Sequence, residues 1–246
     1  MNDGFINEKN LIDYLHNKTF NEFNDNIKNF LFFLFGKNID ISARFIANKA
    51  GNQVKPDIYI EYCGVKKYIS IKKGSGNSVH QETIDMFFPF FEQLLDSVQL
   101  SNIKRFHYGD DTIDDSGENR YSANQCKTRY REEIKELNVN INKWENLSVF
   151  LERFLFIGNV GDLLVDVVYY GTLENGLWAS RDEIIDYVSK NYFATNAVHF
   201  GPLSYQVWGR NEKRTAKHPD RRYVMQVKWG SIVKDIIAIR KRNDDV

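Results

Sequence analysis

Residues 55–73, KPDIYIEYCGVKKYISIKK, constrain the fold most, because two runs of alternating polarity flank a single glycine. Alternate residues of a β-strand project from opposite faces of a sheet. If Gly64 and Val65 form a two-residue turn, the pattern predicts a β-hairpin. One face of this hairpin then carries four isoleucines that favour burial in a core: Ile58, Ile60, Ile69 and Ile71.

The other face of the predicted hairpin gathers polar side chains of opposite charge. A turn at residues 64–65 places Asp57 opposite Lys72, with Ser70 one diagonal step away. An acid and a lysine paired across two strands stabilise a sheet without any further role. The same pair is also a carboxylate and an amine that catalysis can use. The spacing by itself leaves both interpretations open.

The composition is that of an ordinary globular chain with balanced charge. The chain has 246 residues, 42% of them hydrophobic, which is enough for a large core. Its formal net charge is zero, so only a local basic patch can indicate nucleic-acid binding. Two cysteines, Cys63 and Cys126, are too few for a disulfide framework or a zinc cluster.

The N-terminal region gives no signal for a membrane or for secretion. Residues 1–10 are polar and of mixed charge, unlike a signal peptide. The longest apolar run near them, residues 30–36, is far too short to span a bilayer. We therefore predict a cytoplasmic protein with no membrane association.

Hydrophobic periodicity predicts a mixed α/β chain with no convincing linker. Helices are expected over residues 7–17, 20–36, 83–100 (with a kink at Pro89), 127–137, 143–156 and 178–191, the last with a capping box from Ser180 to Glu183. Strands are expected over 40–49, 104–110 and, as a terminal hairpin, 203–210 and 222–229, whereas 163–171 fits either helix or strand. We predict one α/β domain over residues 1–246, a mostly antiparallel or mixed sheet flanked by helices, with a core of about 1–110 and a second part of about 111–246.

Three segments resemble a known enzyme family. Pro56-Asp57, followed after twelve residues by Ser70-Ile71-Lys72, resembles the PD-(D/E)xK nuclease signature with serine in place of its middle acid. GFINE, within residues 3–15, resembles the opening helix of small type II restriction endonucleases. Residues 104–110 and 203–236 are more loosely similar to the members that cut four-base-pair sites. The resemblance implies a restriction-endonuclease-like fold and cleavage of double-stranded DNA.

The resemblance also implies roles for the residues of the hairpin. Asp57 and the main-chain carbonyl of Ile71 would bind Mg²⁺, with Mn²⁺ able to substitute. Lys72 would orient or help deprotonate the attacking water and stabilise charge on the phosphate. Ser70 occupies a catalytic position, but its hydroxyl is a poor Mg²⁺ ligand, so a second carboxylate has to come from elsewhere in the chain.

Three acids are candidates for the second carboxylate. Glu82 lies just inside a helix that is expected to start at Ser78, and some related enzymes take the acid from that helix; a first-turn acid also favours a helix dipole without binding a metal. Glu61 shares a strand face with Asp57 but lies four residues away. Glu8 resembles a glutamate of the first helix that often reaches the metal site in this superfamily.

Two loops are candidates for DNA contact. Residues 74–81 form a glycine-containing loop, and the resemblance implies groove contacts from Asn77, His80 and Gln81. The loop of the terminal hairpin holds six basic residues against two acidic ones, which suits phosphate contact but also a solvated turn. Its basic residues are Arg210, Lys213, Arg214, Lys217, Arg221 and Arg222. The acidic stretch 110–118 is expected to lie away from this loop.

The function predicted from these residues is a type II restriction endonuclease that hydrolyses DNA phosphodiesters at a short specific site through a metal-activated water. The biology of the resembled family implies a companion DNA methyltransferase. Two alternatives stay open. One is another PD-(D/E)xK nuclease with a repair, resolvase or defence role. The other is a catalytically inactive relative that binds nucleic acid. This alternative stays open because Ser70 replaces the usual acid of the motif.

Overall fold

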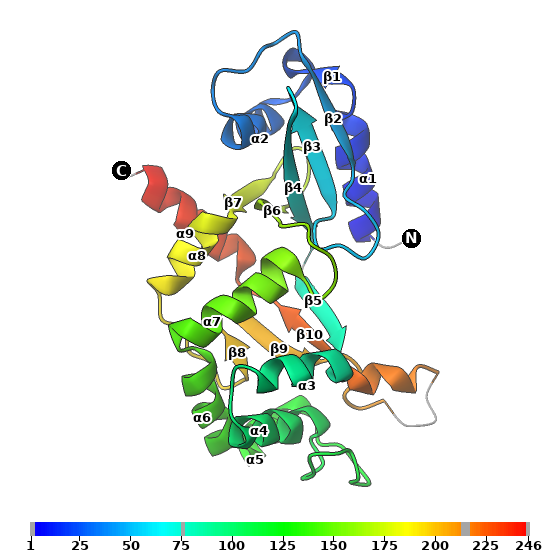
Figure 1. Cartoon of the computed structure of the whole chain (residues 1–246), viewed down its shortest axis with the longest axis vertical. Helices are drawn as coiled ribbons and strands as arrows, with labels where there is room; N and C mark the ends of the chain where they lie inside the picture. Colours follow the sequence, from blue (N-terminus) through cyan, green and yellow to red (C-terminus); the bar gives the residue numbers. More distant parts are fainter. Residues whose placement is uncertain (1–2, 75–76, 213–216, 245–246) are drawn as a thin grey trace. The chain divides into compact units, whose positions relative to one another are not determined.

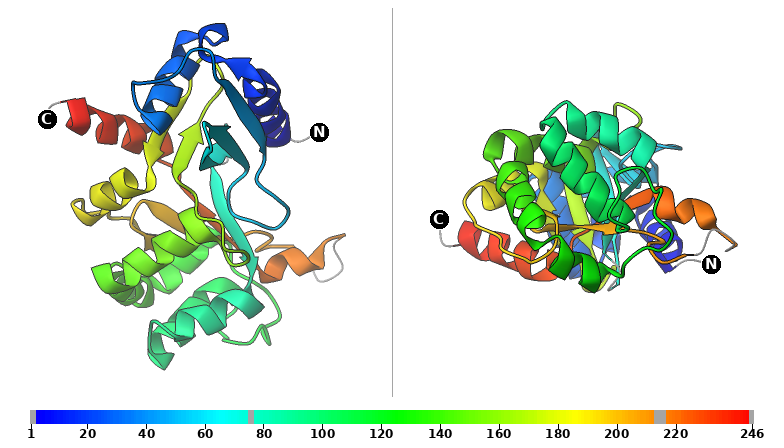
Figure 2. Two further views of the ribbon diagram at one scale, coloured as in Figure 1. Left: turned by 45° about the horizontal axis from the view of Figure 1, so that its top comes forward. Right: turned by 90° about the horizontal axis from the view of Figure 1, so that it is seen from below.

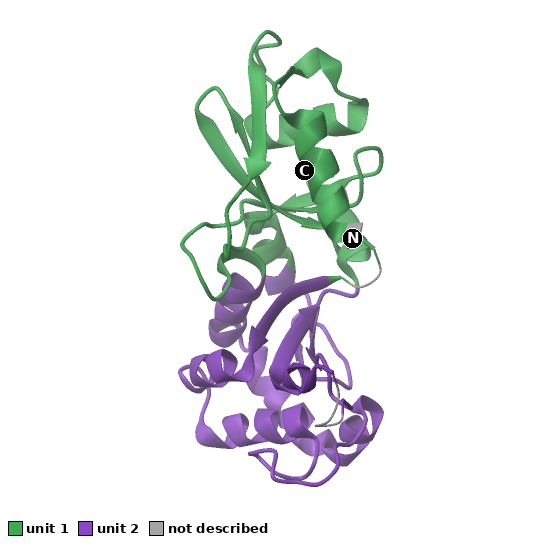
Figure 3. Cartoon of the chain, turned by 90° about the vertical axis from the view of Figure 1, so that its right-hand side faces the viewer, with its two compact units in different colours: residues 1–77, 155–187, 231–246 green, residues 78–154, 188–230 purple. Residues whose placement is uncertain are grey.

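The computed structural model describes residues 3–74, 77–212 and 217–244. The chain divides into two compact units, shown in Figure 3. Unit 1 comprises Met1–Asn77, Leu155–Tyr187 and Ser231–Val246, and unit 2 comprises Ser78–Phe154 and Val188–Gly230. The chain passes from one unit to the other four times, at residues 77/78, 154/155, 187/188 and 230/231. The second and third of these passages lie within helical segments, η2 (Glu152–Ile157) and α8 (Arg181–Ser189). The expected arrangement as one domain stays a prediction.

The described residues of unit 1 form a six-stranded mixed sheet in the order β1-β2-β3-β4-β6-β7 (Figure 1). Its neighbours are antiparallel except β4 and β6, which run parallel. The strands are β1 (Lys18–Thr19), β2 (Arg44–Lys49), β3 (Ile58–Tyr62), β4 (Val65–Lys72), β6 (Val167–Tyr170) and β7 (Leu177–Ser180). The predicted isoleucine face is confirmed, because all four isoleucines are buried in the core of this unit.

Helices cover the sheet of unit 1. They are α1 (Asp3–Leu15), the short η1 (Phe20–Glu22), α2 (Asp25–Phe35) and α9 (Ile232–Asp244). α1 packs against β2 and β4, and α9 packs against β7 (Figure 1 and Figure 2). α2 begins where the Asn24 side chain accepts a hydrogen bond from the Ile27 amide, and it ends at Gly36. Its Phe30 ring packs 4.8 Å from the ring of Tyr169, which fastens the helix to β6.

Unit 2 holds a four-stranded antiparallel sheet in the order β5-β10-β9-β8 within the described residues. Its strands are β5 (Ser78–Thr83), β8 (His199–Phe200), β9 (Leu203–Val207) and β10 (Val224–Lys228). Its helices are α3 (Ile84–Glu92), α4 (Ser97–Tyr108), α5 (Ala123–Arg129), α6 (Arg131–Ile141), α7 (Trp144–Leu151) and η3 (Pro219–Tyr223). The predicted terminal hairpin is confirmed by the pairing of β9 with β10. A mixed sheet in unit 1 and an antiparallel sheet in unit 2, both accompanied by helices, confirm the predicted mixed α/β class.

Three of the sequence predictions for unit 2 are wrong. Residues 78–83 form strand β5 rather than a helix start, because β10, about 140 residues later, supplies a strand partner for them. The single helix expected over 83–100 is two helices, and α4 begins where the Asp96 side chain accepts a hydrogen bond from the Gln99 amide. Most of the segment expected as a strand at 104–110 belongs to helix α4, whose buried residues recur at helical spacing.

The turn of the β3–β4 hairpin lies one residue earlier than predicted. Cys63 and Gly64 occupy it with φ of 49° and 79°, and Tyr62 pairs with Val65. Positive φ at both central residues is the requirement of the tight turns that suit hairpins. The register therefore shifts by two residues, which keeps every side chain on its predicted face but brings Asp57 beside Ser70 rather than opposite Lys72.

None of the helices in the described parts of the chain is long and apolar enough to cross a membrane.

Candidate active site

Asp57 is held at the start of β3 by the neighbouring strand β4. Its amide donates to the Ile69 carbonyl over 2.9 Å. Its carboxylate Oδ2 accepts hydrogen bonds from the Ile71 amide at 2.5 Å and from the Ser70 hydroxyl at 3.2 Å. Two donors from one strand thus orient this carboxylate before any ligand is considered.

Lys72 lies at the end of β4 and joins the same group. Its Nζ donates to Asp57 Oδ2 at 3.2 Å and to its neighbour's carbonyl oxygen, that of Ile71, at 2.9 Å. The Lys72 and Asp57 side chains retain 17% and 24% exposure, so both remain accessible to a ligand from solvent. The amide of Gly171 donates to the Lys72 carbonyl at 2.9 Å and extends the parallel pairing of β4 with β6.

Ser70 is a buried hydrogen-bond donor within this site. It is 2% exposed, and its hydroxyl donates to the Asp57 carboxylate. A carboxylate at this position would place a second negative charge beside Asp57 in a poorly hydrated environment. The serine therefore acts as a neutral support for Asp57, and the residues that can add negative charge lie on other elements.

Glu8 lies on α1 and faces Asp57 and Lys72. Burial raises the pKa of the Glu8 carboxyl above its ordinary value, and the negative charge of Asp57 raises it further. The positive charges of Lys72 and Lys49 act in the opposite direction. α1, which carries Glu8, packs against β4, which carries Lys72, so the three charged groups lie in the same part of unit 1.

Asn7 anchors the helix that carries Glu8. It is 3% exposed, and its Nδ2 donates to the Gly171 carbonyl at 2.8 Å, next to the end of β6. Because Gly171 in turn binds Lys72, one short chain of hydrogen bonds ties α1 to the end of β4. Asn7 is not among the site residues predicted from the sequence; its only signal is its place between Phe5 and Glu8 in the GFINE segment.

Glu82 has a different environment from the one expected. It lies on strand β5 of unit 2, and its side chain is fully buried. Arg153 donates to both of its carboxylate oxygens, at 3.0 and 2.6 Å, and His80 Nε2 lies 3.1 Å away. Burial raises the pKa of Glu82, but the hydrogen bonds from His80 and Arg153 outweigh burial and lower it. Nothing in the sequence around Arg153 had indicated this partner.

Glu61, the third candidate, lies near the turn end of the hairpin. It pairs with Lys66 across the strands, and their charged atoms are 3.5 Å apart. Both side chains are more than a third exposed, so this is an ordinary surface pair of small energetic value.

The oxygen atoms around Asp57 suit a hard divalent cation. The Asp57 carboxylate, the Ile71 carbonyl and the Glu8 carboxylate are all donors of the kind that Mg²⁺ prefers. Asp57 and Ile71 already share one cationic partner, the Lys72 ammonium, which shows that their oxygens face a common space. Within the described ranges, no group of three or more His, Cys, Asp or Glu side chains could hold a metal ion.

The loop candidates for DNA contact differ widely in exposure. Asn77 is half-buried with φ of 40°, His80 is buried against Glu82, and Gln81 is exposed. Lys217 is exposed, and Arg221 is partly exposed beside the Trp208 ring, 4.5 Å from its centre. Lys213 and Arg214 lie outside the described residues.

The expectation that Arg210 and Arg222 belong to an open basic surface is wrong. They are 8% and 6% exposed. Arg210 donates to the carbonyl of Phe106 at 2.8 Å, and Arg222 donates to Asp115 at 3.0 Å. The acidic stretch is therefore in contact with the terminal hairpin, not away from it, because burying a guanidinium requires a nearby acceptor or counter-charge.

The fold of the chain, a central mixed sheet flanked by helices, is similar to a restriction-endonuclease fold. Among solved structures, the chain is similar to the restriction endonuclease MspI in complex with its cognate DNA. The TM-score is 0.52 at 15% sequence identity, over 92% of this chain and 88% of that one. The likeness confirms the predicted fold. No protein-family model and no curated protein matches the sequence.

Proposed function

We propose that this protein is a Mg²⁺-dependent endonuclease that hydrolyses double-stranded DNA at a short specific site, as type II restriction enzymes do. The observation that carries the proposal is the pair of hydrogen bonds from Lys72 Nζ to the Asp57 carboxylate and the Ile71 carbonyl. The likeness in fold to MspI, whose solved structure contains its cognate DNA, supports the choice of DNA as substrate.

The metal ion would be held by Asp57, the main-chain carbonyl of Ile71 and Glu8. Mn²⁺ would substitute for Mg²⁺, because it accepts the same oxygen donors. When bound, the ion supplies Lewis-acid stabilisation of a phosphate oxygen and makes a coordinated water more acidic. Glu8 is preferred to Glu82 as the second carboxylate because Glu82 already forms an internal ion pair with Arg153.

Lys72 would act on the water and on the phosphate. Its ammonium, oriented by Asp57, would position the attacking water and offset the negative charge that develops on the phosphate oxygens. The Ser70 hydroxyl and the Ile71 amide keep Asp57 in the orientation that this requires. Attack on phosphorus would release the 3′ oxygen and leave a 5′-phosphate.

The proposed DNA contacts are the candidates that the structure leaves at least partly accessible: Asn77, Gln81, Lys217 and Arg221. Lys213 and Arg214 precede Lys217 in the sequence and remain proposed contacts. A companion DNA methyltransferase would protect the cell's own recognition sites, and both enzymes would act in the cytoplasm.

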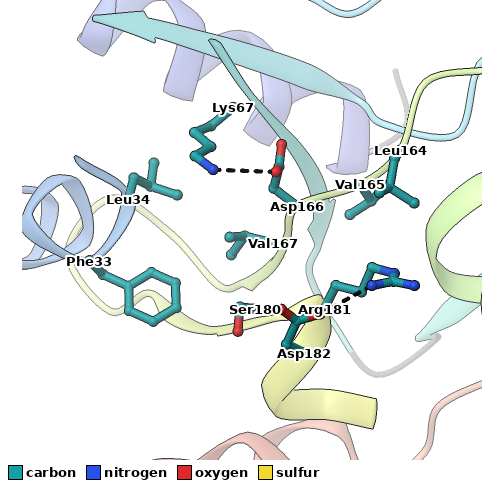
Figure 4. A pocket seen from close by; sticks show the side chains of 10 residues that line it. All are labelled: Phe33, Leu34, Lys67, Leu164, Val165, Asp166, Val167, Ser180, Arg181 and Asp182. Atoms are coloured by element: carbon teal, nitrogen blue, oxygen red, sulfur yellow. Dashed lines mark hydrogen bonds and ion pairs between the residues drawn. The ribbon is translucent and has the colours of Figure 1, made fainter. Parts of the chain in front are cut away.

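Digestion of unmethylated phage DNA with Mg²⁺, followed by sequencing of the ends, tests the proposal. Wild-type protein should give discrete fragments that share one short sequence at their ends. Lys72→Ala should abolish cleavage and leave DNA binding intact, because it removes the ammonium but not the protein surface. Lys67→Ala is the matched control, since Lys67 also lies on β4 and pairs with a carboxylate, Asp166, at 3.5 Å (Figure 4).

Other outcomes distinguish the alternatives. Nicks or fragments without a common end sequence would indicate a nuclease with another role. Binding of DNA without cleavage in Mg²⁺ or Mn²⁺ would indicate an inactive relative, as the serine at Ser70 allows. If Lys72→Ala cleaved as well as wild type, the assignment of this hairpin as the active site would be refuted.

A further inference from the structure

Phe5 presents an exposed aromatic ring beside the candidate active site. It lies on α1 and is 58% exposed, although burial of such a ring stabilises a fold by about 2 kcal/mol. Phe5 and Glu8 are three residues apart on the helix and therefore lie on the same side of it. The ring centre lies 5.9 Å from Lys49 Nζ, and Lys49 pairs with Ile58, the residue after Asp57, so the exposed ring adjoins the residues that would cleave the phosphodiester.

Lys49 places a positive charge beside the Phe5 ring and the candidate active site. It is the last residue of β2 and pairs with Ile58, the residue after Asp57. Its Nζ lies 5.9 Å from the centre of the Phe5 ring, and its charge acts on Glu8. The Lys49 side chain is exposed, and within the described parts of the chain it forms no ion pair with a carboxylate. Its charge is thus available to an anion from solvent.

We propose that Phe5 and Lys49 together bind the DNA strand next to the scissile phosphate. The Lys49 ammonium binds a phosphate oxygen, and the Phe5 ring packs against the deoxyribose of the adjoining nucleotide. A cation beside an aromatic ring matches two accessible parts of a nucleotide in a duplex, the charged phosphate and the apolar face of the sugar. This inference rests on the proposed function, because it takes Asp57, Glu8 and Lys72 as the place where the phosphodiester is cut.

The contact of Phe5 is tested by fluorescence with Phe5→Trp, made in the Lys72→Ala background so that DNA is not cut. Titration with a short duplex in Mg²⁺ should quench the added tryptophan. The matched control is Ile41→Trp: Ile41 is 59% exposed and lies before β2, whereas Lys49 ends that strand. The control should show only the fluorescence change of the four native tryptophans, which is measured separately in the Lys72→Ala protein.

The contact of Lys49 is tested by the salt dependence of DNA affinity. Lys49→Gln should reduce the slope of log affinity against log salt by about 0.9, the value for one lost phosphate contact. Lys37→Gln is the control, because Lys37 is exposed in the loop before β2. Phe5→Leu should weaken DNA binding relative to wild type, because it removes the aromatic ring. Phe5→Tyr should bind DNA with wild-type affinity, because it keeps the ring. Binding by Phe5→Tyr would also show that the helix tolerates a substitution at this position.

The results separate this inference from the proposed function. If wild-type protein cuts DNA but Phe5→Trp is not quenched and the Lys49→Gln slope is unchanged, this inference fails and the proposed function stands. If wild-type protein does not cut DNA but both contacts respond, the inference stands as a nucleic-acid site and the nuclease assignment fails. Absence of cleavage and of both responses overturns the two together.

Discussion

Glu8 and Glu82 differ in what each carboxylate can do, because each has different neighbours. Glu8 has a raised pKa and adjoins a second acid, Asp57. A divalent cation would offset the repulsion between these two carboxylates. Glu82 already forms an ion pair with Arg153 inside unit 2, with the His80 ring beside it. The same residue type therefore serves as a proposed ligand in one unit and as an internal counter-ion in the other.

Replacement of each acid by its amide should separate these roles. Glu8→Gln should lower the apparent affinity for Mg²⁺ in the cleavage assay at least about ten-fold, the size of effect seen when a metal site loses support, with the unfolding midpoint retained. Glu82→Gln should instead cost about 3 kcal/mol of stability, because it leaves Arg153 without its buried counter-charge. Metal titration and urea unfolding measure the two effects. A stable Glu82→Gln protein with a weakened response to Mg²⁺ would return the ligand role to Glu82.

The β3–β4 hairpin shows how an element positions the site through its turn. Cys63, a residue with a Cβ, occupies a left-handed conformation that costs non-glycine residues on the order of 1 kcal/mol or more. Asparagine tolerates this conformation better, and Asn-Gly is the preferred pair for such turns. The turn keeps the register that brings Ser70 and the Ile71 amide to Asp57.

Substitutions in this turn should change stability in opposite directions. Cys63→Asn should raise the free energy of unfolding by up to about 1 kcal/mol. Gly64→Ala should lower it by about 1 kcal/mol, because alanine is strained at a φ of +79°. Gly230→Ala is the control, since that glycine has open space around it and no positive φ. Urea unfolding followed by circular dichroism measures all three; a stabilising Gly64→Ala would contradict the assigned turn.

At the scale of the whole molecule, buried groups couple stability to pH. His107 is fully buried, with Nε2 2.9 Å from the Arg222 carbonyl and Nδ1 2.6 Å from the Tyr205 hydroxyl. A carbonyl only accepts, so Nε2 carries the proton and Nδ1 accepts from Tyr205. Burial lowers the pKa of His107 to about 3, against the opposing effect of the hydrogen bond to Arg222.

Acid should therefore destabilise the protein through His107. The unfolded chain takes up this proton near pH 6.5 and the folded chain only near pH 3, so stability falls as pH falls between these values. The expected slope is about 1.4 kcal/mol per pH unit for one proton. His107→Gln should reduce the pH dependence of the free energy of unfolding, measured with urea, between these two pH values. His218→Gln, a change at an exposed residue, should leave that pH dependence unchanged. An unchanged slope in His107→Gln would show that other groups cause the acid sensitivity.

Local patterns predicted the elements whose signals lie within a few residues. Alternation in residues 55–73 set which hairpin side chains share a face, and a two-residue shift of register preserved that result. The capping box at Ser180 is confirmed, as Ser180 and Glu183 exchange hydrogen bonds at 2.7 and 3.2 Å. Residues 78–83 were misassigned, because a strand is stabilised by a partner that local sequence does not contain.

The sequence by itself determined the mixed α/β class, the polar face with Asp57, Ser70 and Lys72, and the terminal hairpin, because each depends on side-chain periodicity over short distances. Only the tertiary structure decided that Glu8 joins Asp57, that Glu82 pairs with Arg153, and that Arg210 and Arg222 are buried. These outcomes depend on which distant segments share a low-dielectric environment. The identity of a charged residue does not specify whether water, a counter-ion or another acid surrounds its side chain. Those neighbours set the pKa and the role of the group, and only the folded chain supplies them.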